Sequence, residues 1–220
     1  MNNSSELSYK SNYQENVPKS SLVYKLVSYF LVFPIFRIIF RGSVVGRQNI
    51  PRTGPLVIVA NHGSHLDPPL LGHALGRPVS FMAKAELFEV PLLGAIIRAC
   101  GAYPVRRGAS DREAIRTASN RLDNQWAIGV FLDGKRQLNG RVNAPMSGAA
   151  LLAARTGSPI LPVAIINTYR ILGPGNRMPR FLPIKLIIGE LIPAPKTKKK
   201  LDLQFATKQA QNFINTMLDK

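Results

Sequence analysis

All three histidines of the chain lie within twelve consecutive residues, from His62 to His73, and Asp67 lies among them. The apolar run 56–61 before His62 predicts a strand, and the prolines after Asp67 predict a helix start with Asp67 as its N-cap. Catalytic and binding groups of α/β proteins gather where strands end and helices begin. A reversing turn of four residues would bring the Asp67 carboxylate beside the His62 ring. That carboxylate would then hold one ring N–H and leave the other nitrogen free to take a proton.

A His–Asp pair acts on a third group, and the sequence allows three interpretations of what that group is. The first is Ser64 as the nucleophile of an esterase, but no Gly-x-Ser-x-Gly elbow surrounds it. The second is a metal held by His62, His65 and Asp67, whose spacing matches no strong signature. The third is a hydroxyl of a second substrate, deprotonated directly by His62, and it fits the residues best. The single Cys100 excludes a disulfide framework, and its apolar neighbours favour a buried structural role.

The charge of the chain points to anionic partners. Lys and Arg number 29 against 12 Asp and Glu, a net charge of +17. Nucleic acid, anionic lipid headgroups and phosphorylated small substrates would all be attracted. We expect no nucleic acid partner, because the basic residues lack interleaved aromatics and no helix-turn-helix, RNA-recognition or zinc signature is present. The basic cluster KTKKK at 196–200 is interpreted as a solvated or membrane-facing loop.

The body of the chain has the alternating pattern of an α/β protein, and 220 residues fit one domain. Because the apolar runs are nearly continuous, the strands are expected in a sheet covered on both faces by helices. Strands are predicted at 56–61, 79–83, 127–132, 160–166 and 184–190. Helices are predicted at 111–123 with a capping box at Ser110, at 145–156 and at 202–218.

The N-terminal part differs from this body. Residues 1–20 are rich in Ser, Asn and Lys and predict a flexible tail, and 21–41 predict a membrane-associating helix before a domain at 42–220. The uncharged stretch between Lys25 and Arg37 is eleven residues, roughly 16 Å as a helix and about half a hydrocarbon core. Pro34 would kink this helix. We expect a monotopic anchor on the cytoplasmic face; the alternatives are a buried core helix and, least favoured, a true span.

Beyond single residues, the chain resembles the glycerolipid acyltransferases, most nearly the 1-acyl-sn-glycerol-3-phosphate acyltransferases. NHGSHLD has the family's Asn-His-four residues-Asp form, and FMAKAELFEVPLLGAIIRACGAYPVRR is similar to its Lys-x-Glu-Leu segment and second motif. GVFLDGKR stands where the third motif, Phe-Pro-Glu-Gly-Thr-Arg, is expected, and PILPVAI matches the fourth. The order and spacing of these motifs extend over about 45–190.

The resemblance implies a fold, an activity and partners. The fold would be a mixed sheet flanked by helices. The activity would be transfer of a fatty acyl group from acyl-CoA or acyl carrier protein to the free hydroxyl of a lysophospholipid, without a cofactor. The first expected acceptor is 1-acylglycerol-3-phosphate, which gives phosphatidate; another lysophospholipid is the alternative acceptor. A non-catalytic lipid-binding protein on the same scaffold is the rival interpretation, and an anionic membrane surface is an expected partner in each case.

The resemblance also implies roles for particular residues. His62 would be the general base and Asp67 its orienting partner, and Pro162 would belong to the fourth motif. The third motif departs from the family: Leu132 replaces its Pro, Asp133 its Glu and Lys135 its Thr. The expected substrate-binding residues supply cations and short turns for a glycerol phosphate headgroup: Lys84, Gly101, Arg106, Arg107, Asp133, Gly134, Lys135 and Arg136. Alternatively, Asp133 and Arg136 pair with each other to hold the turn.

Overall fold

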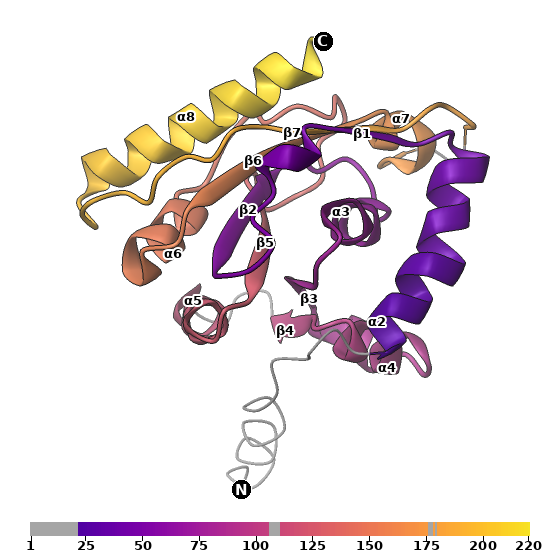
Figure 1. Cartoon of the computed structure of the whole chain (residues 1–220), viewed down its shortest axis with the longest axis horizontal. Coiled ribbons are helices and arrows are strands. Elements are labelled where there is room, and N and C mark those ends of the chain that lie inside the picture. Colours follow the sequence, from indigo (N-terminus) through magenta and orange to yellow (C-terminus); the bar gives the residue numbers. More distant parts are fainter. Residues whose placement is uncertain (1–21, 106–110, 176–177, 179) are drawn as a thin grey trace, which may run out of the picture.

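The computed structural model describes residues 22–105, 111–175, 178 and 180–220. The predicted tail at 1–20 and the capping residue Ser110 lie outside the described residues. The described chain forms one mixed sheet with helices on both faces, as the resemblance implies (Figure 1). The sheet order is β1 (Ser43–Val45), β7 (Lys185–Ile188), β6 (Ile160–Ile166), β2 (Leu56–Ala60), β5 (Ala127–Phe131), β3 (Val79–Lys84) and β4 (Tyr103–Val105). Neighbouring strands pair in parallel except β6 and β7, which are antiparallel.

The central strand β2 explains why the sheet is covered on both faces. It pairs with β5 on one side and β6 on the other, and all five of its residues are buried. Because side chains alternate across a strand, Val57 and Val59 join one core cluster, whereas Leu56, Ile58 and Ala60 join the other. The strand is therefore hydrophobic at every position, as the apolar run predicts.

The two core clusters are completed by different helices. On one face lie α5 (Asp111–Asp123), α6 (Gly148–Thr156) and α8 (Lys200–Leu218). The other face is covered by α3 (Asp67–Leu75) and by the N-terminal helical segment. Residue 157, a glycine with φ of 66°, ends α6 as the sequence predicts. The shorter elements are η3 (Arg47–Asn49), η4 (Ala85–Phe88), α4 (Leu93–Ala99) and α7 (Thr168–Leu172).

The N-terminal segment is one run of helix made of α2 (Leu22–Leu26), η1 (Val27–Val32) and η2 (Ile35–Ile39), the last two in π-helical geometry. The backbone of Pro34 keeps helical angles, so the proline does not end the helix. One stripe, Val32 and Phe36, is buried against the domain, together with Phe40 just beyond η2.

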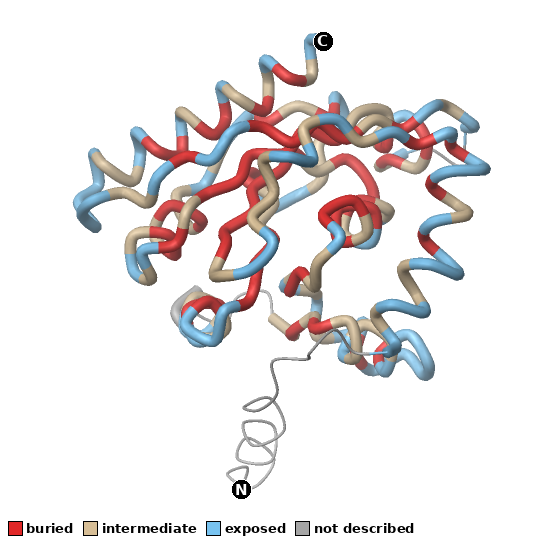
Figure 2. The backbone as a smooth tube through the Cα atoms, viewed as in Figure 1, coloured by how far each residue is buried: buried red, intermediate tan, exposed pale blue. Residues whose placement is uncertain are grey.

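The rest of this segment is exposed or of intermediate burial, as Figure 2 shows. Phe30 is 78% exposed and Ile38 is 72% exposed. Over Leu22–Ile39 the mean hydropathy is 1.8 and 11% of the residues are buried, so the segment is long and apolar enough to cross a membrane. The alternative of a buried core helix is therefore wrong, since the helix docks through one stripe only.

Candidate active site

The motif residues converge because of strand direction. β2, β3, β5 and β6 are parallel, so their carboxyl ends lie at one edge of the sheet. His62 comes two residues after β2, Lys84 is the last residue of β3, and residues 133–136 follow β5. Segments separated by up to 70 residues of sequence thus reach the same edge, which is where α/β proteins place their ligands.

At this edge His62 and Asp67 form the predicted pair. The distance from His62 Nδ1 to Asp67 Oδ2 is 2.8 Å. The same Oδ2 accepts hydrogen bonds from the backbone N–H groups of Gly63 and Ser64, each at 2.8 Å. The Asp67 side chain is fully buried, whereas 17% of the His62 side chain is exposed. Asp67 is not the helix N-cap: α3 begins at Asp67 itself, with Leu66 at the cap position and no side-chain cap.

This geometry selects one tautomer of the catalytic candidate. A carboxylate only accepts hydrogen bonds, so Nδ1 of His62 carries the ring proton and donates a hydrogen bond to Asp67. Nε2 is then the unprotonated nitrogen and can act as a base. The Asp67 carboxylate also stabilises the turn at 63–66, because it accepts hydrogen bonds from the backbone N–H groups of Gly63 and Ser64. A side chain at Gly63 would not fit, since its Cβ would lie 2.5 Å from Cβ of Tyr169.

The His62 ring is also held from its face. The ring of Phe131 stacks on it with centroids 3.9 Å apart and planes inclined by 12°. Phe81 in turn stacks on Phe131 at 5.9 Å. Sequence reasoning did not single out either phenylalanine, because nothing in the sequence indicates which side chain of β5 faces the end of β2. The stacking leaves the ring little freedom to rotate away from Asp67.

Asn61, the residue before His62, holds the backbone around the pair in place through three hydrogen bonds. The Asn61 side-chain amide donates to the carbonyl oxygens of Gly140 at 2.7 Å and Ile165 at 2.8 Å, and its Oδ1 accepts from the Ile165 N–H at 2.8 Å. The His62 carbonyl oxygen accepts from the Gln137 N–H at 2.7 Å. Asn61 therefore joins β2, β6 and the loop after β5, a positioning role visible only in the structure.

Cationic side chains from two segments, the end of β3 and the loop after β5, lie near this edge of the sheet. The pKa of the exposed His65 is lowered, first by desolvation and then by its cationic neighbours Arg136 and Lys84, while Asp67 acts in the opposite direction. Arg136 and Lys84 are thus close enough to His65 to act on its charge, and both add positive charge at this edge of the sheet. Lys135 is exposed, and Arg136 is half-buried beside it. The predicted Arg106 and Arg107 lie outside the described residues.

Residues 41–166 match the model of the Acyltransferase family. The chain belongs to this family. It is 28% identical over 155 residues to a chloroplastic 1-acyl-sn-glycerol-3-phosphate acyltransferase of Arabidopsis thaliana, covering 69% of this chain and 42% of the relative. It is 29% identical over 150 residues to the 1-acyl-sn-glycerol-3-phosphate acyltransferase of Bacillus subtilis, covering 67% of this chain and 72% of the relative.

The fold agrees with a solved structure of the same family. The 1-acyl-sn-glycerophosphate acyltransferase PlsC of Thermotoga maritima superposes with a TM-score of 0.75 at 25% identity, covering 98% of this chain and 87% of that one. Several curated relatives are longer: the chain spans 42%, 44% and 51% of the Arabidopsis, Brassica napus and Borreliella burgdorferi proteins. The family assignment therefore rests on the domain that carries the His62–Asp67 pair.

In this family member Asp133 holds the loop after β5. Its Oδ2 accepts from the Asn143 N–H at 3.1 Å and its Oδ1 from the Ala144 N–H at 2.9 Å. Within the described residues Asp133 makes no ion pair with Arg136, so the alternative in which those two pair with each other is wrong. The carboxylate is 93% buried, with 7% exposed. Both of its oxygens thus close the loop, while contact with an acceptor stays a prediction.

Two glycines that the sequence predicts to bind substrate, Gly101 and Gly134, have positive φ angles that favour glycine. Gly101 is buried with φ of 87°, and a Cβ there would lie 2.6 Å from the Trp126 ring. Its carbonyl oxygen accepts from Ser80 Oγ at 2.7 Å and from the Arg121 guanidinium. Gly101 therefore positions the start of β4 rather than lying open to a substrate. Gly134 has φ of 62° and is exposed in the turn after β5.

The other sequence interpretations do not match the geometry. Ser64 is fully buried, its Oγ donates to the Leu172 carbonyl at 2.9 Å, and it accepts from the Leu66 N–H at 3.2 Å. A hydroxyl so engaged is not placed as a nucleophile. Among the described residues no three His, Cys, Asp or Glu side chains are grouped to hold a metal ion. His73 packs against the N-terminal helix, with Nδ1 at 2.8 Å from Ser28 Oγ.

Proposed function

We propose that this protein transfers a fatty acyl group from a thioester to the free hydroxyl of a lysophospholipid. The proposed acceptor is 1-acylglycerol-3-phosphate and the product is phosphatidate. The observation that carries the proposal is the 2.8 Å His62–Asp67 pair, which leaves Nε2 free at a cationic sheet edge. The names of the relatives support the acceptor.

The proposed chemistry needs no acyl-enzyme. Nε2 of His62 takes the proton of the acceptor hydroxyl as its oxygen attacks the thioester carbonyl. The imidazolium that forms is stabilised by Asp67, which stays ionised. A C–O bond forms, the C–S bond breaks, and the proton passes from His62 to the departing thiolate. The donor is acyl-CoA or acyl carrier protein, with no resident cofactor.

The cations around the pair are proposed to hold the acceptor phosphate. Lys84 and Arg136 come from two strand ends, and each supplies charge-assisted donors to a phosphate oxygen. In this proposal the phosphate is held by these cations while the glycerol hydroxyl, whose oxygen is two carbons from the phosphate ester oxygen, approaches Nε2 of His62. Lys135, exposed on the same loop, adds a third charge near the entrance.

The protein is proposed to act as a monotopic protein on the cytoplasmic face of a membrane. Acceptor and product carry acyl chains and lie in a bilayer, and the exposed face of the N-terminal helix is apolar. A net charge of +17 adds attraction to an anionic surface. The helix stripe that packs on α3 keeps the domain next to the membrane.

The test is an assay of the purified full chain with a labelled acyl thioester. Acyl-CoA and acyl carrier protein thioesters are each offered with lysophosphatidate, and lysophosphatidylcholine is the matched acceptor of larger headgroup. The expected result is labelled phosphatidate, formed only with a free acceptor hydroxyl. Binding of lysophosphatidate without transfer from either donor would instead identify a lipid-binding protein.

A further inference from the structure

A second group of basic side chains lines a pocket where the N-terminal helix meets β1 and α3. This pocket of about 320 Å³ is lined by Phe33, Phe36 and Arg37 of the N-terminal helix, by residues 42–44 and Arg47, and by His73 of α3. Figure 1 shows the N-terminal helix next to α3, which is seen end-on, and the chain leading from that helix into β1. All three segments contribute residues to the lining of the pocket. We call it the seam pocket, because it lies where the helix meets the domain.

The seam pocket is separate from the catalytic candidates. His73 follows Asp67 by six residues in the same helix, roughly 9 Å along its axis. Neither His62 nor Asp67 lines the pocket, nor do Lys84 and Arg136. A ligand in the seam pocket would therefore not occupy the acceptor site.

The charge of the pocket suits an anion. Its lining has two guanidinium groups and no carboxylate, and within the described residues neither Arg37 nor Arg47 makes an ion pair. Arg37 donates one hydrogen bond to the Gly42 carbonyl at 2.7 Å, which fixes its guanidinium at the pocket. Arg47 is exposed, so its donors are open to a ligand.

His73 lines the same pocket as the two arginines and contributes a polar side chain to it. Burial first, and then the charge of Arg47, lower the pKa of His73, which favours the neutral form of the ring. Ser28 Oγ occupies its Nδ1. When the serine hydroxyl donates to Nδ1, the ring proton lies on Nε2 and is a third donor for an anion.

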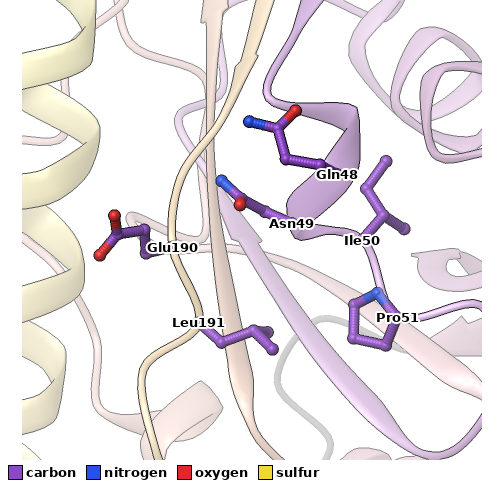
Figure 3. A pocket seen from close by; sticks show the side chains of 6 residues that line it. All are labelled: Gln48, Asn49, Ile50, Pro51, Glu190 and Leu191. Atoms are coloured by element: carbon purple, nitrogen blue, oxygen red, sulfur yellow. The ribbon is translucent and has the colours of Figure 1, made fainter.

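The surroundings indicate which anion. Phe33, which lines the pocket, is 43% exposed, and Phe30 and Ile38 of the same helix are mostly exposed. A ligand with a phosphate and acyl chains satisfies both the arginines and this surface, whereas free phosphate leaves the apolar part unused. The larger surface hollow, of about 470 Å³, has Glu190 and no basic residue among its lining (Figure 3) and offers no such combination.

We propose that the seam pocket binds the phosphate group of an anionic membrane phospholipid. This lipid is distinct from the acceptor, and it holds the N-terminal helix, β1 and α3 at the depth of the headgroups. The site adds a specific contact to the general attraction between a basic protein and an anionic membrane.

The three histidines allow a direct test, because one lines the seam pocket and two lie at the catalytic edge. The full chain in a neutral detergent is titrated with dihexanoyl phosphatidylglycerol while the imidazole NMR signals are followed. The expected result is a saturable shift of the His73 signal at concentrations that leave the His62 and His65 signals unmoved. Shifts confined to His62 and His65 would overturn the proposal.

A variant and its control identify the residues. Arg47→Gln removes charge-assisted contacts and is expected to raise the dissociation constant about tenfold or more, whereas Arg47→Lys is expected to retain part of the affinity. Arg155→Gln removes an exposed arginine from α6 on the other face of the sheet and should change nothing. Equal binding by Arg47→Gln and Arg155→Gln would overturn the proposal, and melting curves confirm that both fold.

Two further titrations of the unmodified protein identify the ligand. Dihexanoyl phosphatidylcholine has the same chains without net charge, and inorganic phosphate has the charge without chains. Both are expected to shift the His73 signal at least tenfold more weakly than phosphatidylglycerol. Equal affinity for phosphatidylcholine would show that the site does not select an anionic lipid and would overturn the proposal. Equal affinity for inorganic phosphate would overturn the assignment to a lipid.

Discussion

His62 meets three constraints at once: Asp67 holds Nδ1, Phe131 covers the ring face, and Gln137 binds the backbone carbonyl. Such a ring is oriented before substrate arrives, and preorganisation is what an efficient general base requires. The residue scale is therefore where the proposed chemistry is tested most directly.

The first prediction is that His62→Ala lowers kcat/KM about 10²–10⁴-fold, the usual contribution of a general base. Steady-state kinetics with acyl thioester and lysophosphatidate measures the loss. The matched control is His65→Gln, which removes a neighbouring exposed histidine and leaves the His62–Asp67 pair intact. If His62→Ala keeps more than half the activity, the general-base role is wrong.

The second prediction concerns Asp133, whose oxygens accept from the N–H groups of Asn143 and Ala144. Asp133→Asn replaces one buried acceptor by a donor facing an N–H, so we expect a loss of about 1–3 kcal/mol in the free energy of unfolding. Denaturant unfolding measures it. Activity should then fall for every acceptor in parallel, because the whole loop moves.

Lys135 is the control for that loop, since it is exposed beside Asp133 but carries no structural hydrogen bond among those observed. Lys135→Met should leave the free energy of unfolding nearly unchanged and raise KM for lysophosphatidate more than for lysophosphatidylcholine. A stable Asp133→Asn protein with altered acceptor preference would contradict the structural role.

At the scale of elements, the N-terminal helix has two faces with different functions. Its buried stripe includes Phe36 and its exposed surface includes Phe30 and Ile38. Deleting the helix would change membrane binding and domain stability together, because removal of the buried stripe also exposes α3 to solvent. Substitutions on single faces separate them.

The third prediction is that Phe30→Ser combined with Ile38→Ser weakens binding to phospholipid vesicles at least tenfold, because two inserted side chains of about 1.5–3 kcal/mol each are lost. Vesicle sedimentation measures the binding, and the melting temperature should stay nearly constant. Phe36→Ala, the matched variant on the buried stripe, should instead cost about 3–5 kcal/mol of stability. Unchanged sedimentation of the double variant would place the membrane contact elsewhere.

At the scale of the whole molecule, a net charge of +17 acts together with the apolar helix. Charges separated by more than a Debye length, about 10 Å at 0.1 M salt, are screened from each other. Apolar insertion, by contrast, is not weakened by salt.

The fourth prediction follows from this difference. Raising salt from about 0.05 M to 0.5 M should weaken, but not abolish, binding to vesicles that contain anionic lipid. With purely zwitterionic vesicles the same change should have little effect. Complete release by salt would mean that the helix does not insert, and insensitivity to salt on anionic vesicles would mean that the cationic surface is not in contact.

Local patterns determined much of this protein. The apolar runs at 56–61, 79–83, 127–132, 160–166 and 184–190 correspond to strands within two residues at each end. The His62–Asp67 pair was predictable because its geometry depends on one short turn. Periodicity predicted the helices at 111–123, 145–156 and 202–218; α6 begins three residues later than predicted and α8 two residues earlier. Each of these features depends on residues close in the sequence.

Contacts between residues far apart in the sequence decided the short edge strands and the roles of Asp133 and Gly101. β1 and β4 are three residues each and exist only because they pair with β7 and β3. Asp133 accepts hydrogen bonds from backbone N–H groups ten and eleven residues away, and the Trp126 ring leaves no space for a side chain at Gly101. A short strand or a buried carboxylate gains its stability from partners that the local sequence does not name, and so only the tertiary structure assigns them.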